Sequence, residues 1–257
     1  MNPVLEEISK SGQVRRAEGG RSIPLHSQVS DEEGLFLQDL VRKVDAKVSL
    51  EVGLAYGVSA LYICDALRVR EGTRHITVDP NQHGGVWGDP WEGIGIANLR
   101  RAGFGDIVQL IEKPSHLALP ELVMAGLEVD FAFIDGWHAF DFTLVDFFYI
   151  DRMLRVGGII AFDDVAWPAV RKVCRFVATN RAYSVVGACG KESWKRRTVG
   201  RLLRTAAAKR LLRTRPLSVF CSPQILRSDW ELGIRGGCVA FRKEKHDDRR
   251  FDHFNEF

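Results

Sequence analysis

The sequence predicts an α/β protein with a Rossmann-like, seven-stranded, mostly parallel sheet that carries helices on both faces. Short apolar runs alternate with segments of helical periodicity along most of the 257 residues, which is the pattern of strands joined by crossover helices. Several of the apolar runs end in glycine or an acid, as strands do where a ligand binds at the carboxyl edge of a parallel sheet. With 46% hydrophobic and 27% charged residues, the chain has the composition of one globular domain.

The elements follow one another in a regular order. The strands are expected at 47–53, 75–79, 107–111, 129–135, 157–163, 183–188 and 237–242. The helices between them are expected at 59–68, 94–102, 117–125, 140–154 and 168–179. A further helix over 31–44, with Ser30 as its N-cap, precedes the first strand and covers one sheet edge or the mouth of the ligand site.

We expect a single domain over residues 1–257. It contains an N-terminal helical segment over about 1–45 and a basic helical insertion over about 191–235, between the last two strands. The charged tail 243–257 is expected to fray.

Composition argues against several classes of protein. No run of eighteen apolar residues is present, so a transmembrane helix is not expected. Residues 1–20 lack the apolar core of a signal peptide, and the five cysteines form no Cys-x-x-Cys pair. Reduced thiols and residence in the cytoplasm are therefore expected.

The segment Glu51-Val-Gly53-Leu-Ala-Tyr-Gly57-Val-Ser59 lies at a strand-to-helix turn. Its glycines permit a tight turn and the close approach of a ligand. The spacing departs from the Gly-x-Gly-x-x-Gly of dinucleotide-binding proteins, and it suits a ligand without phosphates whose ammonium group meets Glu51 directly or through water. Asp79 ends the second strand, where its carboxylate is placed to accept hydrogen bonds from ribose hydroxyls. Together these residues predict a nucleoside-binding site.

A second polar group, Asp135, His138, Asp163 and Asp164, follows the fourth and fifth strands. Neighbouring strands lie about 4.8 Å apart, so these side chains can converge on one ion, and an all-oxygen set favours Mg²⁺, Mn²⁺ or Ca²⁺ over zinc. Such an ion would lower the pKa of an acceptor hydroxyl, and a histidine with a pKa of about 6.5 suits removal of its proton. Taken singly, an Asp-Asp pair is more often a helix cap, and a lone histidine near an aromatic is usually structural. Their shared position at the strand ends favours the metal site.

The order Glu-x-Gly-x-x-x-Gly, Val-Asp-Pro, Phe-Ile-Asp-Gly-x-His and Gly-Gly-x-Ile-x-Phe-Asp-Asp resembles the class I S-adenosylmethionine-dependent O-methyltransferases. The most similar branch is the metal-dependent one, which includes catechol-type enzymes and sugar O-methyltransferases of natural-product pathways. The resemblance covers about 30–179 and the final strand. It implies the class I methyltransferase fold, S-adenosyl-L-methionine as methyl donor, a divalent cation such as Mg²⁺, and transfer of the methyl group to a hydroxyl of a small molecule or glycan.

The resemblance also assigns roles to individual residues. His138, with Asp135, would be catalytic; catechol-type enzymes carry lysine at the position of His138, and some sugar methyltransferases carry histidine. The metal would be held by Asp135, Asp163 and Asp164, the last of which is Asn in some relatives. The donor contacts, from the methionine end to the ribose and the adenine, would be Glu51, Gly53, Tyr56, Gly57, Ser59, Asp79, Pro80, Asn81, Ser115 and Asp135.

Residues 191–215 hold ten Lys or Arg against one acid, with apolar residues near one helical face, which predicts a basic amphipathic helix. Four uses are open. The helix covers the crevice and attracts an acidic acceptor, contacts an anionic surface such as the inner membrane face, binds nucleic acid phosphates, or simply packs on its own domain. Nucleic acid is not favoured, because no RNP-like strand or zinc knuckle accompanies the helix.

Other functions are also compatible with the sequence. A nicotinamide-dependent oxidoreductase or epimerase would use the same sheet, and a non-catalytic relative would use the basic helix to bind membrane or RNA. Trp87, Trp91 and Trp137 either stack on the acceptor or cap the core. Asp146 is interpreted as an ordinary helix acid. The identity of the acceptor and a homo-oligomeric state are not determined by the sequence.

Overall fold

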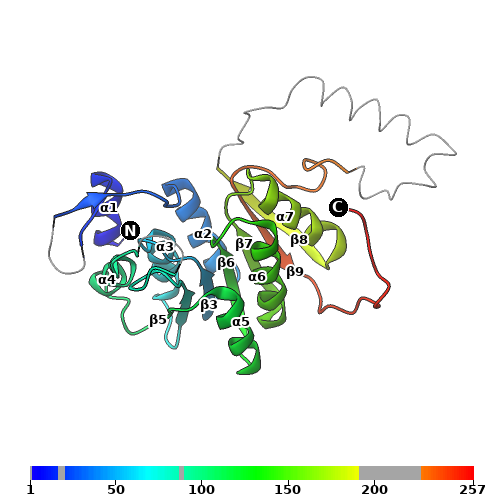
Figure 1. Ribbon diagram of the computed structural model, residues 1–257, viewed down its shortest axis with the longest axis horizontal. Helices are drawn as coiled ribbons and strands as arrows, with labels where there is room; N and C mark the ends of the chain where they lie inside the picture. The colour runs from blue at the N-terminus through cyan, green and yellow to red at the C-terminus, as the bar shows by residue number, and fades with distance from the viewer. Residues whose placement is uncertain (1, 17–20, 87–89, 191–226) are drawn as a thin grey trace, which may run out of the picture.

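A computed structural model describes residues 2–16, 21–86, 90–190 and 227–257, and it confirms the α/β class (Figure 1). The central sheet has seven strands in the order β5-β4-β3-β6-β7-β9-β8. All pairs from β5 to β7 are parallel, and β9 runs antiparallel to both β7 and β8. The strands are β3 (Val48–Val52), β4 (Arg74–Val78), β5 (Val108–Ile111), β6 (Val129–Ile134), β7 (Leu154–Phe162), β8 (Tyr183–Cys189) and β9 (Cys238–Lys243).

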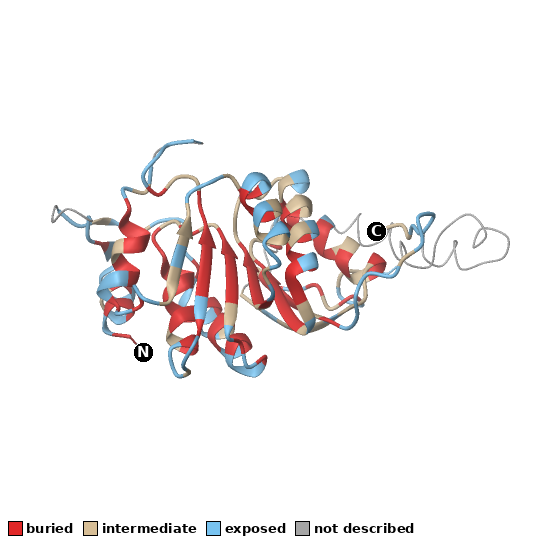
Figure 2. Cartoon of the chain, turned by 90° about the horizontal axis from the view of Figure 1, so that it is seen from below, coloured by how far each residue is buried: buried red, intermediate tan, exposed pale blue. Residues whose placement is uncertain are grey.

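Helices cover both faces of this sheet, as the sequence predicts. Two clusters of buried side chains lie on the two faces: one includes residues of α1 to α4, and the other includes residues of α5 to α7. Figure 2 shows the buried strands lying between the helices. The helices are α1 (Pro3–Ser11), α2 (Asp31–Lys43), α3 (Val58–Leu67), α4 (Ile94–Arg101), α5 (Ser115–Met124), α6 (Phe140–Met153) and α7 (Pro168–Asn180).

The strand order reverses between β3 and β6. From β3 the chain moves outward through β4 to β5, and it then returns to add β6 and β7 on the other side of β3. Such a switch point opens a crevice at the carboxyl ends of the two central strands, which is where ligands bind in sheets of this kind. The topology therefore places the candidate site beside the ends of β3 and β6.

The N-terminal segment is more varied than a simple helical region. Between α1 and α2 lies a two-stranded antiparallel hairpin, β1 (Gln13–Val14) with β2 (Ile23–Pro24). Asn2 caps α1 by accepting a hydrogen bond from the Val4 N–H, and its amide donates to the carbonyl of Ala102. For α2 the expected cap is confirmed, because the Ser30 hydroxyl accepts the N–H of Glu33.

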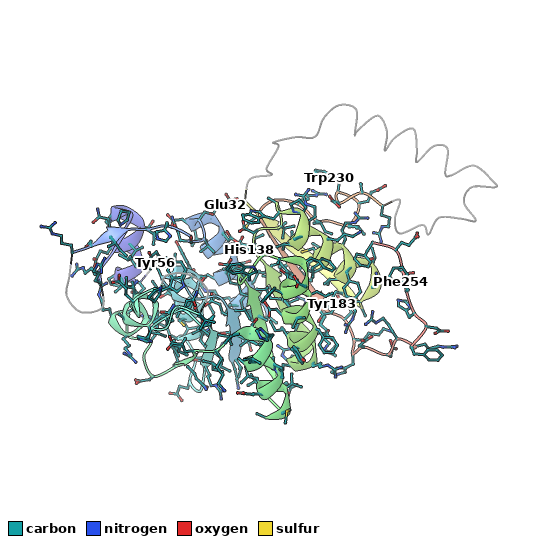
Figure 3. The ribbon with its side chains drawn as sticks, viewed as in Figure 1. Glu32, Tyr56, His138, Tyr183, Trp230 and Phe254 are labelled. Carbon is teal, nitrogen blue, oxygen red and sulfur yellow. The ribbon has the colours of Figure 1, made fainter. Side chains whose placement is uncertain are left out.

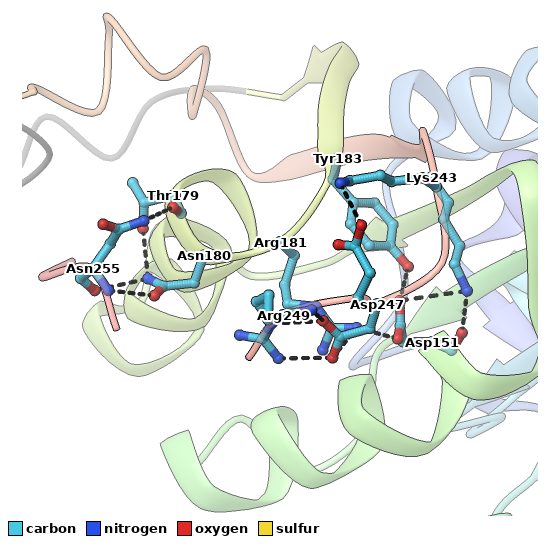
Figure 4. A network of polar contacts seen from close by, with 11 residues as sticks. Asp151, Thr179, Asn180, Arg181, Tyr183, Lys243, Asp247, Arg249 and Asn255 are labelled. Atoms are coloured by element: carbon cyan, nitrogen blue, oxygen red, sulfur yellow. Dashed lines mark hydrogen bonds and ion pairs between the residues drawn. The ribbon is translucent and has the colours of Figure 1, made fainter. Parts of the chain in front are cut away.

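The prediction of a frayed C-terminal tail is wrong. Asn255 exchanges hydrogen bonds with Asn180 and also donates to the carbonyl of Thr179, at the end of α7. Nearer β9, Asp247 pairs with Arg181 (Figure 4). The tail is held because these polar groups are partnered by the end of α7, a contact that local composition does not reveal.

The same network reaches into the protein. Arg181 and the hydroxyl of Tyr183 both bind the carboxylate of Asp151, and the buried ammonium of Lys243 donates to the carbonyls of Asp151 and Leu154 (Figure 4). These contacts join α6, β8 and β9 at the edge of the sheet opposite the candidate site.

The insertion lies between β8 and β9, as expected. The predicted basic helix at 191–215 lies outside the described residues. Among the helices that the structure describes, none combines the length and apolar character needed to span a bilayer.

Candidate active site

Backbone hydrogen bonds align the carboxyl ends of the central strands. The N–H of Gly53 donates to the carbonyl of Val78 at 2.9 Å, and the N–H of Asp135 donates to Val52 at 2.9 Å. One strand further, the N–H of Asp163 donates to Ile134 at 3.1 Å. The residues that follow β3, β6 and β7 are therefore brought to one edge, as the sequence predicts.

The two glycines of the turn are required by the protein's own backbone. At Gly53, with φ +93°, a Cβ atom would lie 2.0 Å from the carbonyl oxygen of Asp135. At Gly57, with φ +78°, it would lie 3.0 Å from the carbonyl oxygen of Gly95. Both glycines thus permit the chain to pass close to neighbouring loops, and this requirement exists whether or not a ligand also approaches them.

Asp79 organises the same turn. Its Oδ2 accepts the N–H groups of Leu54 at 3.0 Å and Ala55 at 2.9 Å, and also the side-chain amide of Gln82 at 3.2 Å. Its Oδ1 accepts the N–H of Asn81 at 2.8 Å. Since Oδ1 has one such partner, it keeps capacity for a ribose hydroxyl, although Asp79 is only 4% exposed.

A small cavity lies beside the glycine turn. Three of the predicted donor contacts line it: Tyr56, Ser59 and Asp135. Residues 27–29, which precede α2, also line it. This segment has no regular structure and carries no motif that marks it as part of a site, so it could not be predicted from the sequence.

Tyr56 anchors that segment to the turn. Its hydroxyl is 2.8 Å from Nε2 of His26, and its ring packs edge-on against Trp91 with centroids 5.0 Å apart. Trp91 therefore contacts the core side of the turn, whereas Trp87 lies outside the described residues. In Figure 3, Tyr56 lies toward the α1 side and His138 lies near the middle of the molecule.

The predicted adenosine contacts follow β4 and begin α5. Beyond Pro80, Asn81 binds the N–H of Trp91 through its carbonyl and the N–H of Val86 through Oδ1, so it holds the tryptophan loop. Ser115 is the first residue of α5 and is buried.

Asp146 is not the ordinary helix acid that the sequence suggested. It is 1% exposed, and burial raises its pKa to about 7, against the lowering effect of a hydrogen bond with Ser115. Its Oδ1 makes no hydrogen bond within the part of the chain that the structure describes.

His138 lies between two of the predicted metal ligands. Its Nε2 is 3.3 Å from Oδ2 of Asp164 and 3.8 Å from Oδ1 of Asp135. Asp164 has φ +50°, in the left-handed region that Asp and Asn adopt more readily than most residues. The structure thus brings together His138, Asp135, Asp163 and Asp164, as the sequence predicts.

Mutual repulsion and burial disfavour the charged forms of these acids. Burial, followed by the charge of Asp163, raises the pKa of Asp135 well above its usual range. The same two causes raise the pKa of Asp164, while His138 lowers it. The region therefore has an excess of carboxylates over cations.

Glu33, on α2, is a further member of this acidic group. Burial and then the charge of Asp163 raise its pKa to about 9. The sequence gives a different reason for this residue, because Ser30-x-x-Glu33 is a capping-box pattern that accounts for the glutamate locally. Its contact with the strand ends is produced by the packing of α2 across the sheet edge.

The carboxylates of Asp135, Asp163 and Asp164 are of the type that a hard divalent cation prefers as ligands, but they are not arranged as a metal site. No group of three His, Cys, Asp or Glu side chains within 2–16, 21–86, 90–190 and 227–257 is arranged to hold a metal. Asp135 and Asp164 face the imidazole of His138 instead. Even so, Asp135 and Asp164, whose pKa values are raised by burial and by the charge of Asp163, form together with Asp163 a set of oxygen ligands that a cation would stabilise.

Exposed aromatic side chains flank His138. The Trp167 ring lies 5.4 Å from the His138 ring, centroid to centroid, and Trp167 and Trp137 are 54% and 57% exposed. Trp137 is among the candidates that the sequence suggests, whereas Trp167, three residues after Asp164, is not.

Known proteins that are similar to this chain are methyltransferases. Residues 50–165 match a family model described as a methyltransferase domain. Tapetum-specific methyltransferase 1 of Arabidopsis thaliana is 31% identical over 139 residues, 53% of this chain and 54% of the relative. Caffeoyl-CoA O-methyltransferase of Populus kitakamiensis is 29% identical over 152 residues, 58% of this chain and 57% of the relative. The chain thus spans just over half the length of the curated relatives it matches.

Solved structures share the fold. An O-methyltransferase from Bacillus cereus in complex with SAH superposes with a TM-score of 0.58 at 22% identity, over 72% of this chain and 83% of the other. An O-methyltransferase of tomaymycin synthesis from Streptomyces achromogenes, in complex with SAM, gives 0.56 at 20% identity, over 74% and 85%. Residues 50–165 therefore resemble a methyltransferase domain, and the chain has the fold of these solved O-methyltransferases.

Proposed function

We propose that this protein transfers a methyl group from S-adenosylmethionine to a hydroxyl of a small molecule. The observation that carries the proposal is the convergence, at one switch point, of the glycine turn organised by Asp79 and the group of His138, Asp135 and Asp164. The glycine turn suits a nucleoside with a charged amino-acid end, and the group around His138 suits removal of a proton beside that nucleoside.

The donor would lie along the edge of the sheet. Tyr56, Ser59 and Asp135 line the cavity that its methionine end would enter, with Glu51 and the two glycines behind it. Asp79 and the segment from Pro80 to Asn81 lie where the ribose and adenosine would follow, and Ser115 where the adenine would end. Bound in this way, the donor supplies a sulfonium methyl group as electrophile.

His138 is the proposed general base. It would take the proton of the acceptor hydroxyl at Nε2 as the oxygen forms its bond to the methyl carbon and the C–S electron pair passes to sulfur, which leaves S-adenosylhomocysteine. The nearby carboxylates of Asp135 and Asp164 would stabilise the imidazolium that results. Alignment of the two reactants supplies a large part of the rate.

We further propose that Asp135, Asp163 and Asp164 hold a divalent cation such as Mg²⁺, which would lower the pKa of the acceptor hydroxyl when bound. The acidic group and its raised pKa values support this proposal. Binding of the cation requires His138 to leave its position between Asp135 and Asp164.

The acceptor would lie against the aromatic side chains beside His138. Trp137 and Trp167 offer exposed rings on which a flat molecule or the apolar face of a sugar can stack. The relatives named for caffeoyl-CoA and for flavonoid support a small-molecule acceptor. A glycan acceptor, contact of the basic segment with an anionic surface, and a homo-oligomer stay predictions.

The free thiols of Cys64, Cys174, Cys189 and Cys238 support the proposal that the protein resides in a reducing compartment such as the cytoplasm.

Calorimetric titration with S-adenosylhomocysteine and with NAD tests the donor. We expect the former to bind with a micromolar or lower Kd and the latter not to bind. Binding of NAD without S-adenosylhomocysteine would replace the methyltransferase proposal with the oxidoreductase alternative.

Titration with Mn²⁺, followed by electron paramagnetic resonance in the presence of S-adenosylhomocysteine, tests the cation. Asp163→Asn should weaken Mn²⁺ binding at least about tenfold, the loss expected when one ligand of a metal site is changed. Asp141→Asn, an exposed acid in the first turn of α6, is the matched control and should bind as the wild type does. Equal Mn²⁺ affinity of both variants would exclude this site.

A further inference from the structure

A stripe of four polar side chains lies inside the sheet, behind the glycine turn. Ser49 and Glu51 are on β3, and His75 and Thr77 are on β4. Parallel register pairs Ser49 with His75 and Glu51 with Thr77, and all four residues are 0% exposed. Strands covered by helices on both faces are normally apolar at such positions, so the stripe destabilises the fold unless its groups bind one another or a ligand.

Three of the four side chains form one hydrogen-bond chain. The Ser49 hydroxyl is 2.8 Å from Nδ1 of His75, and Nε2 of His75 is 3.3 Å from Oε2 of Glu51. With Glu51 ionised and His75 neutral, one arrangement satisfies every partner: Nε2–H donates to the carboxylate, and Nδ1 accepts the serine O–H. In that arrangement the stripe keeps the single negative charge of Glu51.

One oxygen of Glu51 is left over. Within the described chain, Glu51 Oε1 is buried without a hydrogen-bond partner, as is the hydroxyl of Thr77. Glu51 lies two residues before Gly53, and its charge is among those that raise the pKa of Asp135, which lines the cavity beside the turn. The unpartnered oxygen is therefore next to the place proposed for the methionine end of the donor.

We propose that His75 and Ser49 are positioning residues, which hold Glu51 so that its Oε1 accepts a hydrogen bond from the α-ammonium group of the donor, directly or through one water. The inference rests on the proposed function and adds two residues that do not touch the donor. Without the imidazole, the buried carboxylate would have no hydrogen-bond donor among the described residues, and nothing would fix its orientation toward the ammonium. Fixing its rotamer in advance also lowers the entropic cost of binding.

The tautomer of His75 gives a test on the wild-type protein. Nitrogen-15 NMR of histidine-labelled protein should show a neutral ring protonated at Nε2, whose resonance shifts when S-adenosylhomocysteine is added. A ring protonated at Nδ1 would mean that His75 donates to Ser49 instead and that Glu51 carries a proton, which overturns the inference.

Ligand selectivity separates positioning from general damage. His75→Phe should weaken binding of S-adenosylhomocysteine at least about tenfold, or about 1.4 kcal/mol. It should leave binding of 5′-methylthioadenosine, which lacks the amino-acid end, within about twofold of wild type. His75→Gln retains an N–H donor and should restore most of the affinity. Thr77→Val, at the neighbouring position on the same face, removes an unpartnered hydroxyl and serves as the matched control.

Ser49→Ala provides an independent variant that removes only one hydroxyl. We expect it to weaken S-adenosylhomocysteine about threefold without affecting methylthioadenosine, because Glu51 keeps its donor but the ring is less firmly oriented. If wild type binds S-adenosylhomocysteine and the variants of His75 and Ser49 bind it equally well, or lose both ligands in parallel, the positioning role is wrong while the proposed function stands. Wild type that binds neither ligand would overturn both.

Discussion

The carboxylate of Asp79 connects β4 to the turn after β3, and its replacement should loosen that turn before any donor is present. Asp79→Asn removes the negative charge and leaves one oxygen to accept four N–H groups. If that oxygen stays with Leu54 and Ala55, the new amide faces the N–H of Asn81 as a second donor. A hydrogen bond to a charged group contributes about 1.5–3 kcal/mol. Losing one bond and weakening the other three should lower the free energy of unfolding by about 2–4 kcal/mol.

Urea unfolding followed by circular dichroism at constant pH measures this loss. Asp106→Asn, an exposed acid before β5, is the control and should change stability by less than about 0.5 kcal/mol. Hydrogen exchange adds a local readout, because the amides of Leu54 and Ala55 should exchange faster in the variant even where the rest of the sheet stays protected. An Asp79→Asn protein as stable as the control, with unchanged exchange at these two amides, would refute the structural role derived from the hydrogen bonds.

Three further predictions follow from buried contacts. Gly53→Ala places a methyl group 2.0 Å from the carbonyl oxygen of Asp135 and should lower the free energy of unfolding by more than about 3 kcal/mol. Gly72→Ala, also at positive φ but with open space around it, should lower it by about 1–2 kcal/mol. Equal losses for the two variants in urea unfolding would contradict the steric argument. Asp146 has a folded pKa of about 7 and an ordinary value of 3.8, so its ionisation favours the unfolded chain and wild-type stability should fall between about pH 4 and pH 7, by up to about 4 kcal/mol. Asp146→Asn should remove that fall, and a variant whose unfolding curve keeps the wild-type pH dependence would show that another group is responsible. Asn180→Ala removes the two side-chain hydrogen bonds that hold the backbone of Asn255 and should raise the rate of carboxypeptidase cleavage several-fold; unchanged cleavage would mean that the tail is held elsewhere.

The candidate site was predictable to the extent that its residues follow strands. Asp135, Asp163 and Asp164 come directly after buried apolar runs, and parallel strands that lie side by side bring their ends to one edge. His138 could be assigned to the same site because it follows Asp135 by three residues. For these residues, spacing along the chain and position in space are nearly equivalent.

Other members of the site could not be found in this way. Glu33 lies in the first turn of α2 and follows no strand, so only the packing of α2 over the sheet shows its contact with Asp163. In the sequence, His75 is simply one residue of a predicted buried strand. Its proposed role depends on the register between β4 and β3, which pairs His75 with Ser49. His26 approaches Tyr56 from a segment without regular structure.

The alternation of apolar runs and helical segments determined the strands, the helices of the core and the side of the sheet on which ligands bind, because hydrophobic periodicity and turn residues act over a few neighbours. The motifs also predicted the resemblance to methyltransferases. Tertiary structure alone decided which distant parts of the chain contact each other. Gly53 packs against the backbone of Asp135, Asp79 accepts hydrogen bonds from the amides of the turn, and the tail binds the end of α7. Those contacts join residues far apart in the chain. They depend on distances of a few ångströms that no local pattern encodes, since hydrogen bonds and steric contacts lose their effect within such distances.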